Sequence, residues 1–179
     1  MNPQDILHFW FEEATPEQHF NKDAAFDAAI RERFGPVHGA ALHGELAAWR
    51  DTPGGRLAEI IVLDQFSRNL FRDDARAFAG DGMALVLAQE AVRAGADRDM
   101  PAAWRAFLYM PFMHSESRVI HIEAERLFRH PGLERNYDFE LKHKAIIDRF
   151  GRYPHRNAAL GRASTPAELE FLDQPGSSF

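Results

Sequence analysis

Apolar residues recur along this chain at the three- and four-residue spacing of amphipathic helices, and no stretch sustains the alternation of a half-exposed strand. Alanine, leucine, glutamate and arginine dominate these periodic stretches, whereas valine and threonine, which favour strands, are few. The pattern therefore predicts an all-α protein.

Proline, glycine and capping residues divide the periodic stretches into segments of helical length. We expect helices over residues 4–13, 21–34, 37–49, 56–71, 83–95, 101–110, 116–130, 138–150 and 164–172, with a further helix entry at Pro16. Two boundaries depend on proline, since Gly35-Pro36 is expected to end one helix and Pro111 another. The short links favour antiparallel helical hairpins. We expect about eight or nine helices, in a single α-helical domain over residues 1–179. We expect the tail, residues 173–179, to be flexible.

The segment 56–71 is apolar nearly all round, which indicates a central helix. Asp64 falls on the apolar stripe that holds Ile60 and Ile61, because it follows them by four and three residues. Arg68 lies one turn further along the same line. An unpaired buried charge is costly, so we expect each charge to have a partner, either the other or a third group. A buried ion pair that only sets the helix register is the structural alternative.

A histidine lies on a second apolar face. Phe139, Ile146, Ile147 and Phe150 form one side of the segment 138–150, and His143 sits among them. His143 is either a core histidine bonded to a neighbouring carbonyl, or a catalytic or ligand-binding group.

The turn at residues 111–117 holds His114, Ser115 and Glu116 just ahead of a helix. A serine or an acid at this place serves as a helix cap. Because anions also bind at helix N-termini, the turn is a candidate site as well as a capping motif.

The turn at residues 150–157 is unusually rich in donors, with Arg152, His155, Arg156 and Asn157 in eight residues. Gly151 follows the last periodic residue of its helix, as a C-cap glycine does. The glycine and the proline of this turn account for its backbone but not for its charged side chains, so we expect at least one of them to serve a site.

The charge and composition exclude several classes of function. The formal net charge is −6 with a pI near 5.8, so we expect no nucleic-acid partner and no anionic membrane surface. No segment has the apolar length of a membrane span and no signal peptide is present, which predicts a cytoplasmic, bacterial-type protein. The chain has no cysteine, its nine histidines lack known metal-site spacing, and nucleotide-binding motifs are missing, so we expect no metal and no cofactor.

Several longer stretches occur together: "LDQFSRNLFR" (63–72), "RAFAGD" (76–81), "FLYMPFMHSES" (107–117) and "FGRYPHRNAALGRAST" (150–165), with "ILHFWF" (6–11) near the start. In this combination the chain resembles, over nearly its whole length, the bacterial family called domain of unknown function 924. The resemblance implies a tetratricopeptide-like α/α fold. Its recurrent polar positions correspond here to Asp64, Gln65, Arg68, Asn69, His114, Ser115, Glu116, His143, Arg152, His155, Arg156, Asn157 and Arg162. The chain departs from the family at Ser67, where proline is common, and at Ser117, where an acid is common.

We hypothesise that these residues converge on a pocket for a small anionic or polar ligand, with hydrolase-type chemistry as the default reaction. Arg68 and Arg152 would bind a carboxylate or phosphate through paired hydrogen bonds. His143 or His155 would act as the general base or acid.

In the same hypothesis, Asp64 or Glu116 would orient that histidine. The remaining ligand contacts would come from Asn69, His114, Arg156 and Asn157. Two alternatives stay open: a tetratricopeptide-like module that binds a protein or peptide, and a polar network that only stabilises the fold. The sequence gives no oligomeric state.

Overall fold

The computed structural model describes residues 1–177, and in this part of the chain every regular element is a helix, with no strand. The all-α prediction is therefore confirmed. The α-helices are α1 (Pro3–His8), α2 (Pro16–Phe20), α3 (Ala24–Leu42), α4 (Pro53–Ile61), α5 (Ser67–Leu70), α6 (Asp81–Arg93), α7 (Ala102–Met113), α8 (Arg118–Phe128), α9 (Glu134–Phe150) and α10 (Pro166–Leu172). Short 3₁₀ turns cover Ala47–Asp51, Ala75–Phe78 and Pro154–Arg156, and π-helical turns cover Phe9–Glu13 and Val62–Phe66.

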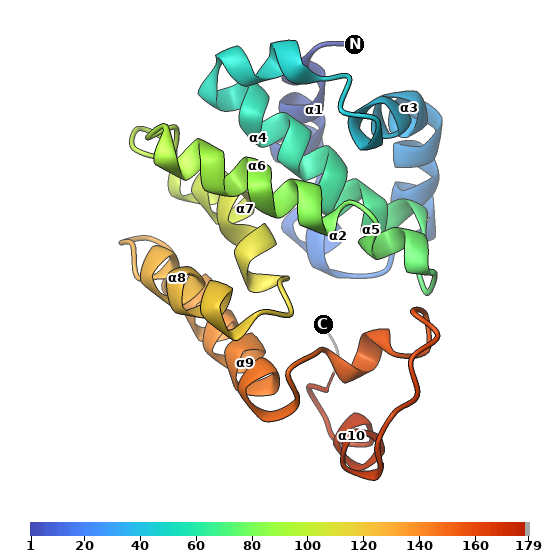
Figure 1. The fold of residues 1–179 in the computed structure, drawn as a ribbon. Helices are drawn as coiled ribbons and strands as arrows, with labels where there is room; N and C mark the ends of the chain where they lie inside the picture. Colours follow the sequence, from blue (N-terminus) through green and yellow to red (C-terminus); the bar gives the residue numbers. More distant parts are fainter. Residues whose placement is uncertain (178–179) are drawn as a thin grey trace.

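The predicted central helix exists and carries the core. The π-helical turn Val62–Phe66 joins α4 to α5 without a break, and α1, α3, α6 and α7 pack around the joined helix (Figure 1). Leu57, Ile60, Ile61, Leu63 and Phe66 on it are fully buried. A π-turn widens the helix by one residue, and such turns are common at functional sites. Here the widened turn contains the buried residue Asp64.

Two predicted helix boundaries are wrong, because proline lies inside a helix in both places. Pro36 lies within α3 and Pro111 within the last turn of α7. Proline removes one backbone hydrogen bond and costs roughly 3 kcal/mol in a helix interior. In α3 this cost is offset because Phe34 and Val37 on either side are buried in the core. Gly35 also has no Cβ to clash with the proline ring.

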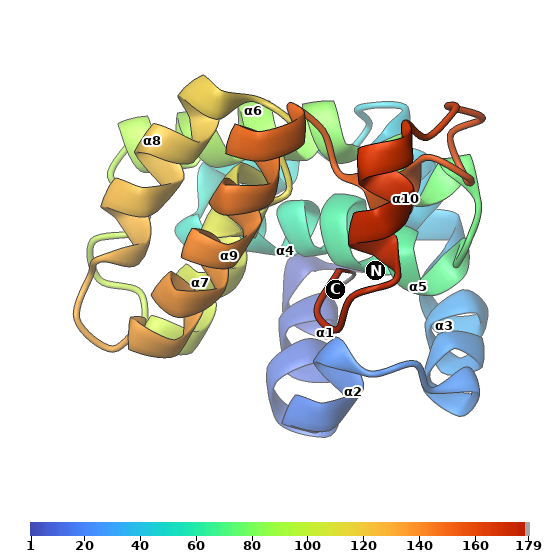
Figure 2. The ribbon, with the colours of Figure 1, turned by 90° about the horizontal axis from the view of Figure 1, so that it is seen from below.

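The α8–α9 hairpin and the C-terminal segment that ends in α10 lie on the same side of the central helix (Figures 1 and 2). The link between them turns at Gly151, whose φ of 72° is left-handed and whose N–H caps α9 by donating to the Ile147 carbonyl. Ile146, Ile147 and Tyr153 form a small second core under this link, apart from the main core. The C-terminal segment is held to the body by this small core, against which Phe171 of α10 packs, and by polar contacts such as the Arg156–Asp81 pair.

The end of the described chain contacts α10. The Ser177 hydroxyl donates to the Leu172 carbonyl at 3.0 Å, so the tail turns back on α10. Residues 178 and 179 of the predicted flexible tail lie outside the described residues. No helix within residues 1–177 has both the length and the apolar character needed to cross a membrane.

Candidate functional site

Polar side chains from the central helix, α6, α7, α9 and the turn after α9 meet at one place, which we call the polar junction. Asp64, Arg68 and His114 form its centre, and Asp81 and Arg156 border them. Beside these charged groups lie the rings of His143, Tyr153 and His155.

Asp64 is the most buried charge of the polar junction, with 1% of its surface exposed. Its carboxylate accepts hydrogen bonds from the Nδ1 of His114 at 2.7 Å and from the amide of Gln65 at 2.5 Å, and pairs with Arg68 at 3.1 Å. Burial acts to raise the pKa of Asp64, but the charges of Arg68 and His114 outweigh burial and hold it well below its usual range. Asp64 is therefore ionised, and since a carboxylate only accepts, His114 carries a proton on Nδ1.

Arg68 and Arg156 share the carboxylate of Asp81 at the start of α6. Arg68 binds it through both terminal nitrogens at 2.9 and 3.0 Å, and Arg156 reaches it at 3.3 Å. The Arg156 guanidinium lies over the rings of Phe78 and Tyr153, 4.7 and 4.5 Å from their centroids. Its Nε is buried without a hydrogen-bond partner in the described part of the chain. Burial first and the charge of Arg68 second lower the pKa of Arg156. A half-buried arginine, Arg68, and a buried one, Arg156, thus meet at one carboxylate.

Burial keeps the rings of His143 and His155 neutral at pH 7. His143 donates from Nδ1 to the Phe139 carbonyl one turn back at 2.8 Å, and burial lowers its pKa to about 3. Burial and the charge of Arg156 lower the pKa of His155 to about 4. At neutral pH both rings offer hydrogen bonds without charge.

Glu116 and Asn157 hold the chain next to the polar junction. Glu116 accepts from the Tyr153 backbone N–H at 2.7 Å and pairs with Arg162 at 2.6 and 2.9 Å. Burial raises its pKa, and the hydrogen bonds from Arg162 and Tyr153 outweigh burial, so the net shift is downward. Asn157 accepts from Arg162 at 3.0 Å and donates to Ser164 at 3.0 Å. These bonds stabilise the loop that carries His155 and Arg156.

Asn69 and Arg152 make their contacts elsewhere. The Asn69 amide donates to Asp27 of α3 at 2.8 Å, a carboxylate that Arg72 also binds. Arg152 is bidentate to Glu168 of α10 at 2.6 and 2.8 Å.

The structure therefore divides the sequence-predicted residues into two groups. Those in the polar junction are Asp64, Arg68, His114, His143, His155 and Arg156. Those that bond to other partners are Asn69, Glu116, Arg152 and Asn157.

Sequence reasoning missed two members of the polar junction, Asp81 and Tyr153. Asp81 follows Gly80 at the first position of α6, where an acid commonly complements the helix dipole. Tyr153 lies in the donor-rich turn and is fully buried. The only signal for either was its place inside the stretches quoted above, because a single sequence does not distinguish a capping acid or a core tyrosine from a site residue.

The polar junction has no ready set of metal ligands. Within residues 1–177, no group of three or more histidine, aspartate or glutamate side chains has the arrangement of a metal site.

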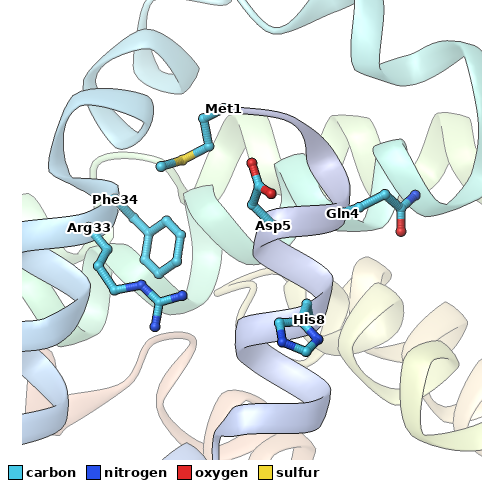
Figure 3. A pocket seen from close by; sticks show the side chains of 6 residues that line it. All are labelled: Met1, Gln4, Asp5, His8, Arg33 and Phe34. Atoms are coloured by element: carbon cyan, nitrogen blue, oxygen red, sulfur yellow. The ribbon is translucent and has the colours of Figure 1, made fainter.

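A pocket of about 450 Å³ lies elsewhere, between α1 and α3 (Figure 3). Its lining residues are Met1, Gln4, Asp5, His8, Arg33 and Phe34, and none belongs to the polar junction. Arg33 is already bidentate to Glu13 at 2.6 and 3.0 Å, so its charge is neutralised.

Comparison with known proteins places the chain among bacterial proteins. The model of a family described as bacterial protein of unknown function (DUF924) matches residues 6–176. The chain is similar to a solved structure titled as a protein of unknown function, ATU0120, from Agrobacterium tumefaciens. The two are 39% identical, with a TM-score of 0.91 over 96% of each chain. No curated protein sequence matches.

Proposed function

This chain belongs to the DUF924 family of bacterial proteins, and we propose that it binds a small anionic or polar molecule at the polar junction and transforms it by acid–base chemistry of the hydrolase type. The observation that carries the proposal is the contact between His114 and the buried, ionised Asp64 at 2.7 Å. A carboxylate that orients an imidazole through Nδ1 leaves Nε2 as the atom that exchanges a proton with a substrate.

His114 is the group proposed to move the proton. Its side chain is 16% exposed, whereas Asp64 behind it is 1% exposed. Within residues 1–177, the His114 ring makes one side-chain hydrogen bond, through Nδ1 to Asp64. The Asp64 carboxylate would stabilise the imidazolium that forms when Nε2 takes a proton from water or from a substrate.

This assignment differs from the sequence-based hypothesis, in which His143 or His155 is the base. With pKa values of about 3 and 4, both rings are weak bases at neutral pH. Burial lowers the pKa of His114 as well, but there the charge and the hydrogen bond of Asp64 oppose the shift. In the proposal they position polar groups of the ligand. Asp64 keeps its predicted role as the orienting acid, but its partner is His114.

Arg68 and Arg156 are proposed to bind the anionic group. Both guanidinium groups converge on Asp81, and the 3.3 Å contact of Arg156 is the weaker. A carboxylate or phosphate oxygen of the ligand would accept a hydrogen bond from the buried Nε of Arg156, which has no partner in the described structure. The ligand would then compete with Asp81 for Arg156.

The structural alternative has one observation in its favour. Arg68 and Arg156 together already balance the charges of Asp64 and Asp81, as they would in a network that only fastens α6 to the central helix. Binding of a protein or peptide by a tetratricopeptide-like surface stays a prediction.

The experiment compares the wild type with His114→Asn, whose amide nitrogen replaces Nδ1 and keeps a donor to Asp64 but cannot act as a base. The substrates are p-nitrophenyl acetate and p-nitrophenyl phosphate. We expect hydrolysis of at least one of them by the wild type, and a loss of roughly 100-fold or more in His114→Asn. His19→Asn is the matched control, because His19 bonds to the Trp10 carbonyl far from the polar junction.

Binding is tested separately by titrating inorganic phosphate and acetate while the side-chain Nε–H signals of the arginines are followed by NMR. We expect the Arg156 signal to shift and that of Arg33, whose charge is neutralised at the other pocket, to stay. Equal hydrolysis by the wild type and His114→Asn, together with no shift at Arg156, would refute the proposal.

A further inference from the structure

A second histidine–carboxylate pair lies behind the polar junction and takes no part in the proposed chemistry. His121 of α8 and Glu140 of α9 have no exposed surface, and the His121 Nδ1 lies 2.7 Å from a Glu140 oxygen. The other oxygen of Glu140 is buried without a hydrogen-bond partner in the described structure. A buried pair of this kind is costly, so its contacts indicate what it does.

His121 of this pair and the neighbouring Tyr153 bond to the backbone on either side of His114. The His121 Nε2 bonds to the Ser115 carbonyl at 2.8 Å, and the Tyr153 hydroxyl donates to the Met113 carbonyl at 2.5 Å. The hydroxyl and His121 Nε2 are 3.2 Å apart, so the two donors form one connected group. Residues 113 and 115 are both held, and His114 lies between them.

The bonds also determine where one proton is. A carbonyl oxygen only accepts, so His121 must carry a proton on Nε2. The 2.7 Å contact between the His121 Nδ1 and the Glu140 oxygen then needs a second proton, which is carried either by Nδ1 or by Glu140. Burial raises the pKa of Glu140, and the hydrogen bond from His121 opposes this rise. The titratable groups that face the pair are Glu125, His143, Lys144, Asp148 and Tyr153.

We propose that Glu140, His121 and Tyr153 are positioning residues for His114: they hold the two flanking carbonyls and so keep the His114 ring bonded to Asp64. The His114 N–H still bonds to the Met110 carbonyl, but α7 ends at Met113, and the last carbonyls of a helix have no partner within it. The inference rests on the proposed role of His114.

The test uses NMR of the His114 ring in the full chain and needs no substrate. The Nδ1–H signal of His114 is recorded with its rate of exchange with water and its titration midpoint. The charged and titratable groups that face this ring are Asp64, Arg68, Asp81, His143 and His155. In His121→Phe, which keeps the ring but removes both bonds, we expect Nδ1–H exchange to become roughly tenfold faster, as for the loss of one hydrogen bond.

Glu140→Gln is the conservative variant that should rescue the geometry. A glutamine amide donates to Nδ1 of a neutral His121 and leaves Nε2–H on the Ser115 carbonyl, so we expect wild-type exchange at His114. His19→Phe is the control for loss of a histidine-to-carbonyl bond elsewhere, and it should leave His114 unchanged.

Unchanged exchange and titration of His114 in a folded His121→Phe variant would overturn the inference. If that variant does not fold, Tyr153→Phe decides, because it removes only the hydroxyl bond to Met113 and should raise the exchange rate in the same direction; no change there overturns the inference as well. The catalytic proposal fails separately, since it depends on the rate of His114→Asn and not on the exchange of Nδ1–H.

Discussion

The neutral, buried His143 makes the stability of this protein depend on pH in a way that one substitution isolates. His143 is 6% exposed, and burial lowers its pKa from an ordinary value of 6.5 to about 3. Above pH 6.5 the ring is neutral in both the folded and the unfolded chain, so its full contribution to stability is present there. As pH falls below 6.5, the unfolded chain binds a proton that the folded chain does not, and stability is lost.

The magnitude follows from the two pKa values. Each pH unit in which only the unfolded chain binds the proton costs about 1.36 kcal/mol. Of the interval from pH 8 to pH 5, about 1.5 pH units lie below 6.5, so protonation of His143 in the unfolded chain lowers the free energy of unfolding by about 2 kcal/mol. His155, with a pKa of about 4, adds a further loss of about 2 kcal/mol in the same direction.

The assay is urea unfolding followed by circular dichroism at pH 8 and pH 5, for the wild type and His143→Asn. Asparagine keeps a donor for the Phe139 carbonyl but does not titrate. We expect the variant to lose about 2 kcal/mol less than the wild type between the two pH values. His43→Asn, at an exposed position, controls for the removal of a histidine and should lose as much as the wild type.

The comparison cancels the contributions of the other buried histidines, since they are the same in both proteins. An equal loss of stability in the wild type and His143→Asn would show that His143 is not held neutral by burial, and the reasoning would be refuted.

Two further predictions concern the scaffold. A Cβ at Gly55 would lie 1.9 Å from the Trp49 carbonyl oxygen, so Gly55→Ala should lower the free energy of unfolding by about 3 kcal/mol or more. A Cβ at Gly39 in α3 would meet no atom within 4 Å, so Gly39→Ala should raise the free energy of unfolding by about 0.5–1 kcal/mol. Urea midpoints that do not move in opposite directions in the two variants would contradict this. Arg152→Ala removes the bidentate partner of Glu168, so amide exchange in α10 should become faster while the His114 ring signals stay in place; a shift of those signals would connect Arg152 to the polar junction.

Local features were predictable because their causes lie close together in the sequence. Gly151 caps α9 with a left-handed φ, and Thr165 forms a capping box with Glu168 at the start of α10. Asp64 and Arg68 share a face because they are one helical turn apart on one helix, and the structure pairs them at 3.1 Å.

The prolines show where this local reasoning fails. Pro36 and Pro111 both read as helix ends, since proline is unfavourable in any isolated helix. In the folded chain, burial of the flanking apolar residues outweighs that cost, and both helices continue. The energy that decides the outcome comes from neighbours that a local window does not contain.

The sequence by itself determined the all-α class, the central helix and the apolar faces that hold Asp64 and His143. Only the tertiary structure decided which polar side chains pair with one another. His114 meets Asp64 across 50 residues of chain and Arg156 meets Asp81 across 75, whereas Arg152, four residues before Arg156, binds Glu168. The physical reason is that helical period and burial cost are properties of a segment, while a hydrogen bond between distant segments depends on how the helices pack.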